Sequence, residues 1–161
     1  MKIGIIFYSI SGHTEKAARM LAKAFIQAGH PAELVRLEVS GPANLNNENT
    51  DLRFIPSLHS YEALVLCTPV RGGALPPPVA KFLNQMEPLT GRKTAAFLTH
   101  FFRLKWGADQ VAELVQAGLE ARGGIFEGWR DARWFITGPG KKLEIAVNGM
   151  VRLLVGEKPG D

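Results

Sequence analysis

The sequence has little of what marks secreted, metal-binding or membrane-spanning proteins. Among its 161 residues is a single cysteine, Cys67, so an internal disulfide is excluded. No cluster of Cys and His has the spacing of a metal site. No apolar run approaches the roughly 20 residues needed to cross a bilayer, and the N-terminus lacks a signal-peptide pattern. We therefore expect a cytoplasmic protein with no membrane insertion.

Runs of like charge are also missing. The chain has 19 Lys and Arg against 15 Asp and Glu, and the excess of +4 forms no run of five or six basic residues. This pattern favours a solvated surface over a nucleic-acid patch, so we expect no nucleic-acid partner. The length and the hydrophobic fraction of 46% predict one globular domain over residues 1–161.

What the sequence does contain is a buried strand that leads at once into a loop of hydroxyl groups. The run 2–8 is apolar, β-branched and aromatic, which is typical of a strand covered on both faces of a parallel sheet. Apolar residues then recur at helical spacing from Ala17 to Ala28, so a helix follows. Between strand and helix lie Ser9, Ile10, Ser11, Gly12, His13 and Thr14.

This loop has the groups that bind a phosphate. The first N–H groups of a helix lack partners inside it and carry partial positive charge, which stabilises an anion. Ser9, Ser11 and Thr14 add hydroxyl donors, and Gly12 permits close approach. The loop has neither the lysine of a triphosphate P-loop nor the Gly-x-Gly-x-x-Gly dinucleotide pattern. The alternative is structural: Ser11 or Gly12 only caps the helix.

The remaining chain alternates predicted strands and helices, which indicates a doubly wound α/β fold. Helices are expected up to Ala28, from Pro78, around 111–119 and from Gly140. Residues 52–60 are expected to contain a short helix or helical turns, and 133–137 an extension of the last strand or a hairpin arm. The further strands are expected at 33–39, 64–67, 93–99 and 125–129.

Two motifs resemble the flavodoxin family. The pattern Ser9-x-Ser11-Gly12-x-Thr14 resembles its FMN-phosphate loop, usually Thr/Ser-x-Thr/Ser-Gly-x-Thr. The run 61–70 resembles the family's Tyr-Asp-Ala-Ile-Val-x-Gly-Ser/Thr-Pro-Val, with Cys67 where a glycine is usual. The resemblance includes the NAD(P)H:quinone oxidoreductase-like flavodoxins. It implies a five-stranded parallel sheet of order 2-1-3-4-5, helices on both faces, and FMN at the switch between strands one and three.

The resemblance also implies which residues bind the cofactor. Arg71 is a candidate cation near flavin N1 or O2, and the alternative is a solvated loop arginine. The residues implied to hold the FMN phosphate are Ser9, Ile10, Ser11, Gly12, His13 and Thr14, and those implied to border the ring are Thr68, Pro69, Val70, Arg71, Gly72 and Gly73.

The segment 100–106 departs from the small residues that flavodoxins often have after strand four. Trp106 or a phenylalanine could stack on the flavin, but the favoured interpretation places Phe101, Phe102 and Trp106 in the core or a subunit interface. His100 could exchange a proton during two-electron reduction, or be a satisfied residue at a strand end. If these side chains fill the ring pocket, FMN cannot bind.

The sequence is compatible with two functions. The first is an FMN-binding redox protein, with a redox partner protein or with NAD(P)H and a small acceptor such as a quinone or flavin. The sequence does not separate an electron carrier from an enzyme. The second is a binding or regulatory module of the same fold that has lost FMN. A homo-oligomer is compatible with either function.

Overall fold

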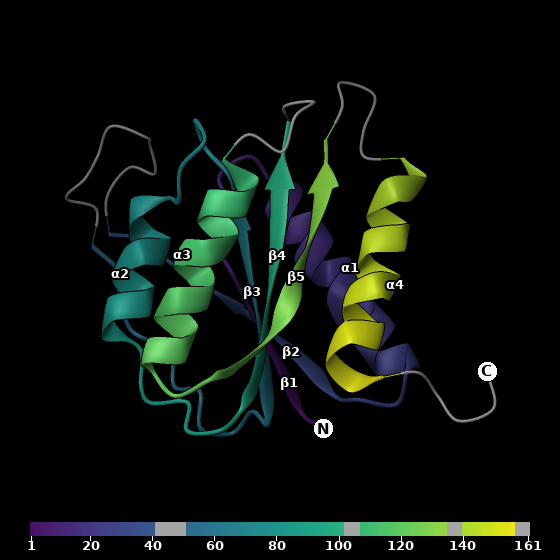
Figure 1. Cartoon of the computed structure of the whole chain (residues 1–161), viewed down its shortest axis with the longest axis horizontal. Helices are drawn as coiled ribbons and strands as arrows, with labels where there is room; N and C mark the ends of the chain where they lie inside the picture. The colour runs from purple at the N-terminus through teal and green to yellow at the C-terminus, as the bar shows by residue number, and fades with distance from the viewer. Residues whose placement is uncertain (41–50, 102–106, 135–139, 157–161) are drawn as a thin grey trace.

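A computed structural model describes residues 1–40, 51–101, 107–134 and 140–156, and the remaining segments are the grey traces in Figure 1. Within these ranges strands and helices alternate along the chain. The elements are β1 (Ile3–Phe7), α1 (His13–Gln27), β2 (Ala32–Arg36), β3 (Ala63–Pro69), α2 (Pro77–Gln85), β4 (Lys93–His100), α3 (Ala108–Ala121), β5 (Ile125–Arg133) and α4 (Lys141–Val155).

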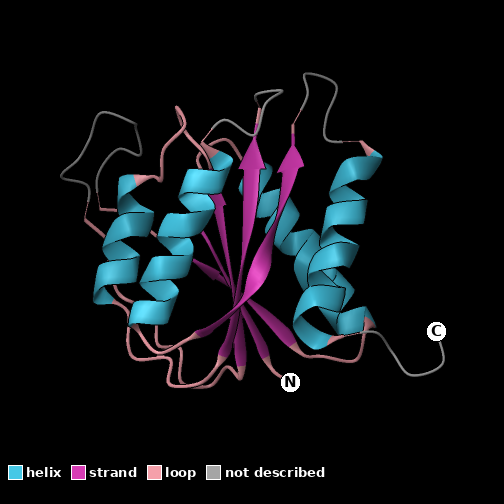
Figure 2. Cartoon of the chain, viewed as in Figure 1, coloured by secondary structure: helices cyan, strands magenta, loops and turns pink. Residues whose placement is uncertain are grey.

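The five strands form one sheet of order β2-β1-β3-β4-β5, and every neighbouring pair is parallel. Helices α1 and α4 cover one face, and α2 and α3 cover the other (Figures 1 and 2). The predicted doubly wound fold and its strand order are therefore confirmed.

Two apolar clusters hold these layers together, one on each face. Along β1, Ile3, Ile5 and Phe7 belong to the cluster under α1 and α4, whereas Ile6 belongs to the cluster under α2 and α3. Every residue of β1 is buried because both of its faces are covered. This explains why the strand reads as a continuous apolar run rather than an alternating one.

The pairing register brings the carboxyl ends of β3, β4 and β5 to one edge. Pro69 pairs with Thr99, and His100 pairs with Arg133. The loop after β1 lies at the same edge, beside the end of β3. In open α/β sheets this edge, at the point where strand order reverses, is where ligands bind.

The structure corrects two local predictions. Residues 52–60 form no helix, and their one turn is at 59–60, where the Tyr61 N–H donates to the Leu58 carbonyl oxygen at 3.1 Å. Leu52 makes an isolated antiparallel bridge with Val39. Pro56 accounts in part for the absence of a helix, because it disfavours helical geometry at the residue before it. The last strand is longer than predicted and continues to Arg133 beside β4. Of the segment 133–137, only Arg133 extends the strand, and 135–137 lie outside the described residues.

No helix in the described ranges is long and apolar enough to cross a membrane. The same residues contain no group of three or more His, Cys, Asp or Glu arranged to hold a metal ion.

Candidate functional site

The loop between β1 and α1 is shaped by Ser9 and Gly12. The Ser9 Oγ accepts hydrogen bonds from the N–H groups of Gly12 (3.1 Å) and Glu15 (3.3 Å). Gly12 is the residue that caps α1, with φ of 91°, and a Cβ added there would meet no heavy atom within 4 Å. Gly12 is therefore the N-cap residue of α1, and the hydroxyl that accepts from the N–H groups near the helix start belongs to Ser9 rather than Ser11.

Capping by Ser9 leaves several donors of this loop open. Among the described residues, the N–H groups of Ile10, Ser11, His13 and Thr14 have no hydrogen-bond acceptor. They lie at the positive end of a 15-residue helix, beside the exposed Ser11 and Gly12. Open N–H groups at a helix N-terminus suit a phosphate, so this part of the chain fits the phosphate end of FMN.

The Thr14 hydroxyl has a partner that the sequence did not suggest. Its Oγ1 lies 2.8 Å from the Oγ1 of Thr99, and both residues are at least 97% buried. The contact ties the first turn of α1 to the end of β4. A hydroxyl can donate one hydrogen bond and accept others, so Thr14 can accept from Thr99 and still donate to an anion.

The side chain of His13 is held in an aromatic cluster. Its ring stacks on Trp134, with centroids 4.9 Å apart and planes at 22°, and lies 5.0 Å from the ring of Phe101. Its Nδ1 is 3.2 Å from the Ser11 Oγ. Burial, and secondarily the positive charge of Lys16, lower the pKa of His13 below its usual 6.5.

The loop after β3 closes on itself. Arg71 and Ala74 exchange two backbone hydrogen bonds of 3.0 Å, with φ of 58° at Gly72 and 75° at Gly73. Two consecutive positive φ angles define a type I′ turn, which only residues such as glycine adopt readily. The predicted ring-bordering pair of glycines is therefore a tight turn.

Gly107 fixes that turn against the start of α3. A Cβ on Gly107 would lie 2.5 Å from the Cα and from the carbonyl oxygen of Gly73. The backbones of these two loops thus approach closely because neither residue has a side chain.

Arg71 is half-buried beside the phenol of Tyr8. Burial raises the pKa of Tyr8, and the nearby Arg71 charge opposes that rise. Arg71 also lines a small hollow that reaches His13 in the neighbouring loop. Arg71 is therefore only partly exposed, and its role beside a flavin stays a prediction.

His100 is a satisfied residue at the end of β4. It is buried, and its Nε2 lies 2.7 Å from the Asp131 Oδ2. Phe101 is 50% exposed, so it is not part of the core. Phe102 and Trp106 lie outside the described residues.

The described residues enclose only a small space between the two loops. The hollow has a volume of about 30 Å³, well below the roughly 300–1,000 Å³ of typical ligand pockets. A flavin ring would therefore lie against its rim. The hollow is lined by Ser11, His13, Pro69, Val70, Arg71, Thr99, His100, Phe101 and Trp134.

Of the predicted residues, the structure brings Ser11 and His13 together with Pro69, Val70 and His100 around this hollow. Thr68 instead lies buried in β3, with its hydroxyl donating to the Pro69 carbonyl oxygen at 3.1 Å. Sequence reasoning missed Thr99, Asp131 and Trp134. Their one available signal was position, since all three lie at or near the carboxyl ends of β4 and β5, the edge of the sheet where ligands bind.

The sequence matches a known protein family. A sequence model of the family described as NADPH-dependent FMN reductase matches residues 1–125 of the 161. An NAD(P)H dehydrogenase (quinone) of Methylocella silvestris is 29% identical over 109 residues, covering 60% of this chain and 55% of that protein. One of Acidovorax ebreus is 24% identical over 98 residues, covering 56% and 49%. This chain thus spans about half the length of the curated relatives it matches.

Solved structures share the fold. Oxidised flavodoxin 1 from Bacillus cereus superposes with a TM-score of 0.66 at 19% identity, covering 98% of this chain and 99% of that one. A flavoprotein in complex with FMN from Lactobacillus acidophilus gives a TM-score of 0.63 at 20% identity, covering 81% and 92%.

These findings confirm the flavodoxin-like resemblance, and with it FMN as the expected cofactor at the level of the family. The family model covers far more than half of the sequence. The chain therefore belongs to the NADPH-dependent FMN reductase family.

Proposed function

We propose that this chain binds FMN with its phosphate at the β1–α1 loop and transfers electrons from NAD(P)H to a quinone or another small acceptor. The observation that carries this proposal is the set of open N–H groups of Ile10, Ser11, His13 and Thr14 at the start of α1. No other helix start among the described residues follows a buried strand through a loop of three hydroxyl side chains.

The residues around the loop would have separate roles. The open N–H groups and the Ser11 hydroxyl would bind the phosphate. Thr99, at the end of β4, would orient the Thr14 hydroxyl through their hydrogen bond. The turn 71–74 would give the ring a backbone border of fixed shape, with Arg71 supplying positive charge. The bound flavin would supply the electron-transfer chemistry, and the protein its binding, orientation and tuning.

The names of the curated relatives support an enzyme rather than a carrier, because both are called NAD(P)H dehydrogenase (quinone). The discriminating measurement is steady-state oxidation of NAD(P)H by the FMN-loaded protein with and without a quinone. Turnover that requires the quinone supports the enzyme. Absence of turnover, with one-electron rather than two-electron reduction of the bound flavin, supports a carrier.

The phosphate position is tested by comparing FMN with riboflavin, which lacks the phosphate. Replacing Ser11→Ala removes one hydrogen bond to a charged group, worth roughly 1.5–3 kcal/mol, so FMN affinity should fall about tenfold to a hundredfold. Riboflavin affinity should stay unchanged. Both affinities can be measured by quenching of flavin fluorescence.

Ser57→Ala is a matched control for this variant. The Ser57 Oγ contacts the His59 Nδ1 at 2.6 Å, just as the Ser11 Oγ contacts His13, but the pair lies in the segment before β3. Ser57→Ala should leave FMN affinity unchanged. Equal FMN affinity in Ser11→Ala and the unmodified protein would show that the FMN phosphate does not bind at the β1–α1 loop.

The small volume of the hollow favours a second candidate, a module of this fold that has lost FMN. The absorbance spectrum separates the two candidates. Flavin bands retained after addition of FMN and desalting support the reductase. A colourless protein that takes up no FMN supports the flavin-free module.

A further inference from the structure

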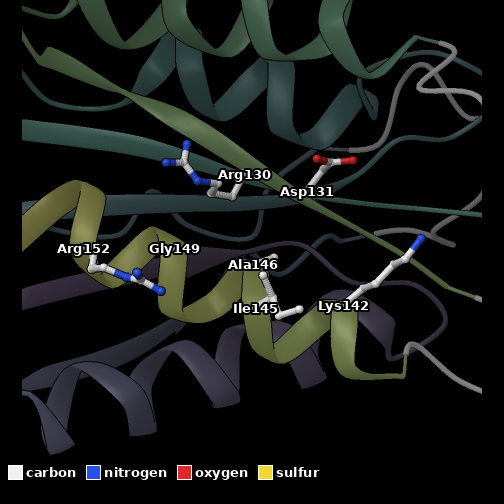
Figure 3. A pocket seen from close by; sticks show the side chains of 7 residues that line it. All are labelled: Arg130, Asp131, Lys142, Ile145, Ala146, Gly149 and Arg152. Atoms are coloured by element: carbon white, nitrogen blue, oxygen red, sulfur yellow. The ribbon is translucent and has the colours of Figure 1, made fainter.

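A positively charged groove lies between the edge strand β5 and helix α4 (Figure 3). Its volume is about 470 Å³, which falls within the roughly 300–1,000 Å³ of small-molecule sites. The residues that line it include Arg130, Asp131, Lys142, Ile145, Gly149 and Arg152.

Helix α4 contributes one continuous stripe to this groove. Lys142, Ile145, Gly149 and Arg152 are three or four residues apart, so they share one helix face. The stripe spans about 15 Å, at 1.5 Å per residue. The opposite face is buried and contains Leu143, Val147, Met150 and Leu154.

The cations of the groove have no acidic partner in the described part of the chain. Arg130 donates only to the carbonyl oxygen of Trp129 (2.8 Å), and neither Lys142 nor Arg152 forms an ion pair there. Elsewhere on the surface, Arg36 pairs with Glu15. Among the residues that the structure describes, the groove therefore has more cations than carboxylates.

One carboxylate does line the groove, but it is already engaged. The Asp131 Oδ2 lies 2.7 Å from the Nε2 of His100. His100 in turn lines the hollow beside the β1–α1 loop. This hydrogen-bonded pair joins one end of the groove to the candidate flavin site.

Two further features give the groove a shape for a ligand with both charged and apolar parts. A Cβ on Gly149 would come within 3.2 Å of the Arg130 Nε, so the missing side chain lets this guanidinium lie across α4. Ile145 is 66% exposed and offers an apolar surface between Lys142 and Arg152.

We propose that this groove binds the adenosine end of NADPH, with the 2′-phosphate at Arg130 and Arg152 and the adenine against Ile145. Guanidinium groups match the geometry of phosphate oxygens and bind them through paired hydrogen bonds. The pyrophosphate then lies toward Lys142, and the nicotinamide end extends past the His100–Asp131 pair to the flavin site. The inference rests on the proposed use of NADPH and assigns the site that selects it over NADH.

The competing explanation is that these cations only protect an exposed sheet edge. Charged side chains on an edge strand discourage pairing with another chain. That role needs no ligand, and the two explanations therefore differ in binding.

The test uses isothermal titration calorimetry of the whole 161-residue chain, with adenosine 2′,5′-bisphosphate as the probe. The probe should bind, and Arg152→Gln should weaken it about tenfold or more, as expected for one lost charge-assisted hydrogen bond. The matched control is Arg19→Gln, an arginine on α1 with a side chain 64% exposed, which should leave binding unchanged. In the FMN-loaded protein, Arg152→Gln should raise KM for NADPH while KM for NADH and FMN affinity stay constant.

Each outcome decides something different. Absence of probe binding, or an equal loss in Arg152→Gln and Arg19→Gln, overturns the groove as a nucleotide site. An equal rise in both KM values overturns selection by the 2′-phosphate. Probe binding by a protein that takes up no FMN supports the groove while rejecting the proposed redox function.

Discussion

The loops after β1 and β3 lie next to each other at the carboxyl edge of the sheet but use their backbones in opposite ways. The β1–α1 loop leaves the N–H groups of four residues open at a helix start. In the loop after β3, the backbone N–H and carbonyl groups of Arg71 and Ala74 hydrogen-bond to each other. The first loop is thus suited to bind an anion, whereas the second provides a fixed shape beside it.

The two loops also differ in how closely other parts of the backbone pack against them. Gly12 has open space around the position of a Cβ, but Gly107, which packs on the turn 71–74, has the Gly73 backbone 2.5 Å from that position. Both positions favour glycine because φ is positive. At Gly107 a side chain would also overlap the Gly73 backbone, whereas at Gly12 there is room for one. Variants at Gly12 therefore test access of a ligand to the loop, and variants at Gly107 test packing against the turn 71–74.

The largest effect is expected for Gly107→Ala. The left-handed backbone costs an L-residue roughly 1–2 kcal/mol, and overlap with Gly73 adds roughly 1–3 kcal/mol, so the free energy of unfolding should fall by about 2–5 kcal/mol. Urea unfolding measures this loss. Gly72→Ala is the control, because φ is positive there but the surrounding space is open, and it should cost only about 1–2 kcal/mol. Equal losses in the two variants would show that the Gly73 contact is unimportant.

A smaller effect is expected for Thr99→Val, which keeps the side-chain shape but removes the partner of the Thr14 hydroxyl. A buried hydroxyl left unpaired costs about 1–3 kcal/mol of stability. FMN affinity should also fall, with riboflavin affinity unchanged, because Thr14 loses its orientation.

Thr99→Ser keeps the hydroxyl and should restore the FMN preference. Loss of stability without any change in the ratio of FMN to riboflavin affinity would limit Thr99 to a structural role.

The smallest effect concerns the protonation of His13. Its pKa is lowered in the folded protein, so its contribution to stability is present above the unfolded value of about 6.5 and is lost as pH falls through the folded pKa. An NMR titration of the His13 ring should give a midpoint below 6.5. Phe101→Ala should move the midpoint upward by exposing the ring to water.

Added inorganic phosphate should also raise that midpoint if the anion binds beside His13, because a nearby negative charge favours the protonated ring. If phosphate leaves the titration midpoint of His13 unchanged, the His13 ring does not lie next to the anion site of the β1–α1 loop.

The sequence by itself determined the layered fold and the position of the main loop. The continuous apolar runs of β1 and β3 indicated strands covered on both faces, and helical spacing after Thr14 placed α1. These signals are local and periodic, so they can be read without knowing the partners of each residue. The motif Ser9-x-Ser11-Gly12-x-Thr14 pointed to the correct family for the same reason.

Only the tertiary structure decided which groups meet. Thr14 and Thr99 are 85 positions apart, and His100 and Asp131 are 31 apart, so no local pattern reveals their hydrogen bonds. The turn at Gly72 and Gly73 was visible as a pair of glycines, but its close contact with Gly107 follows from how α3 packs. The excess of cations between β5 and α4 likewise depends on side chains from two elements sharing one surface. Local periodicity therefore determines where the helices and strands lie, whereas contacts between residues far apart in the sequence determine which functional groups meet at the site.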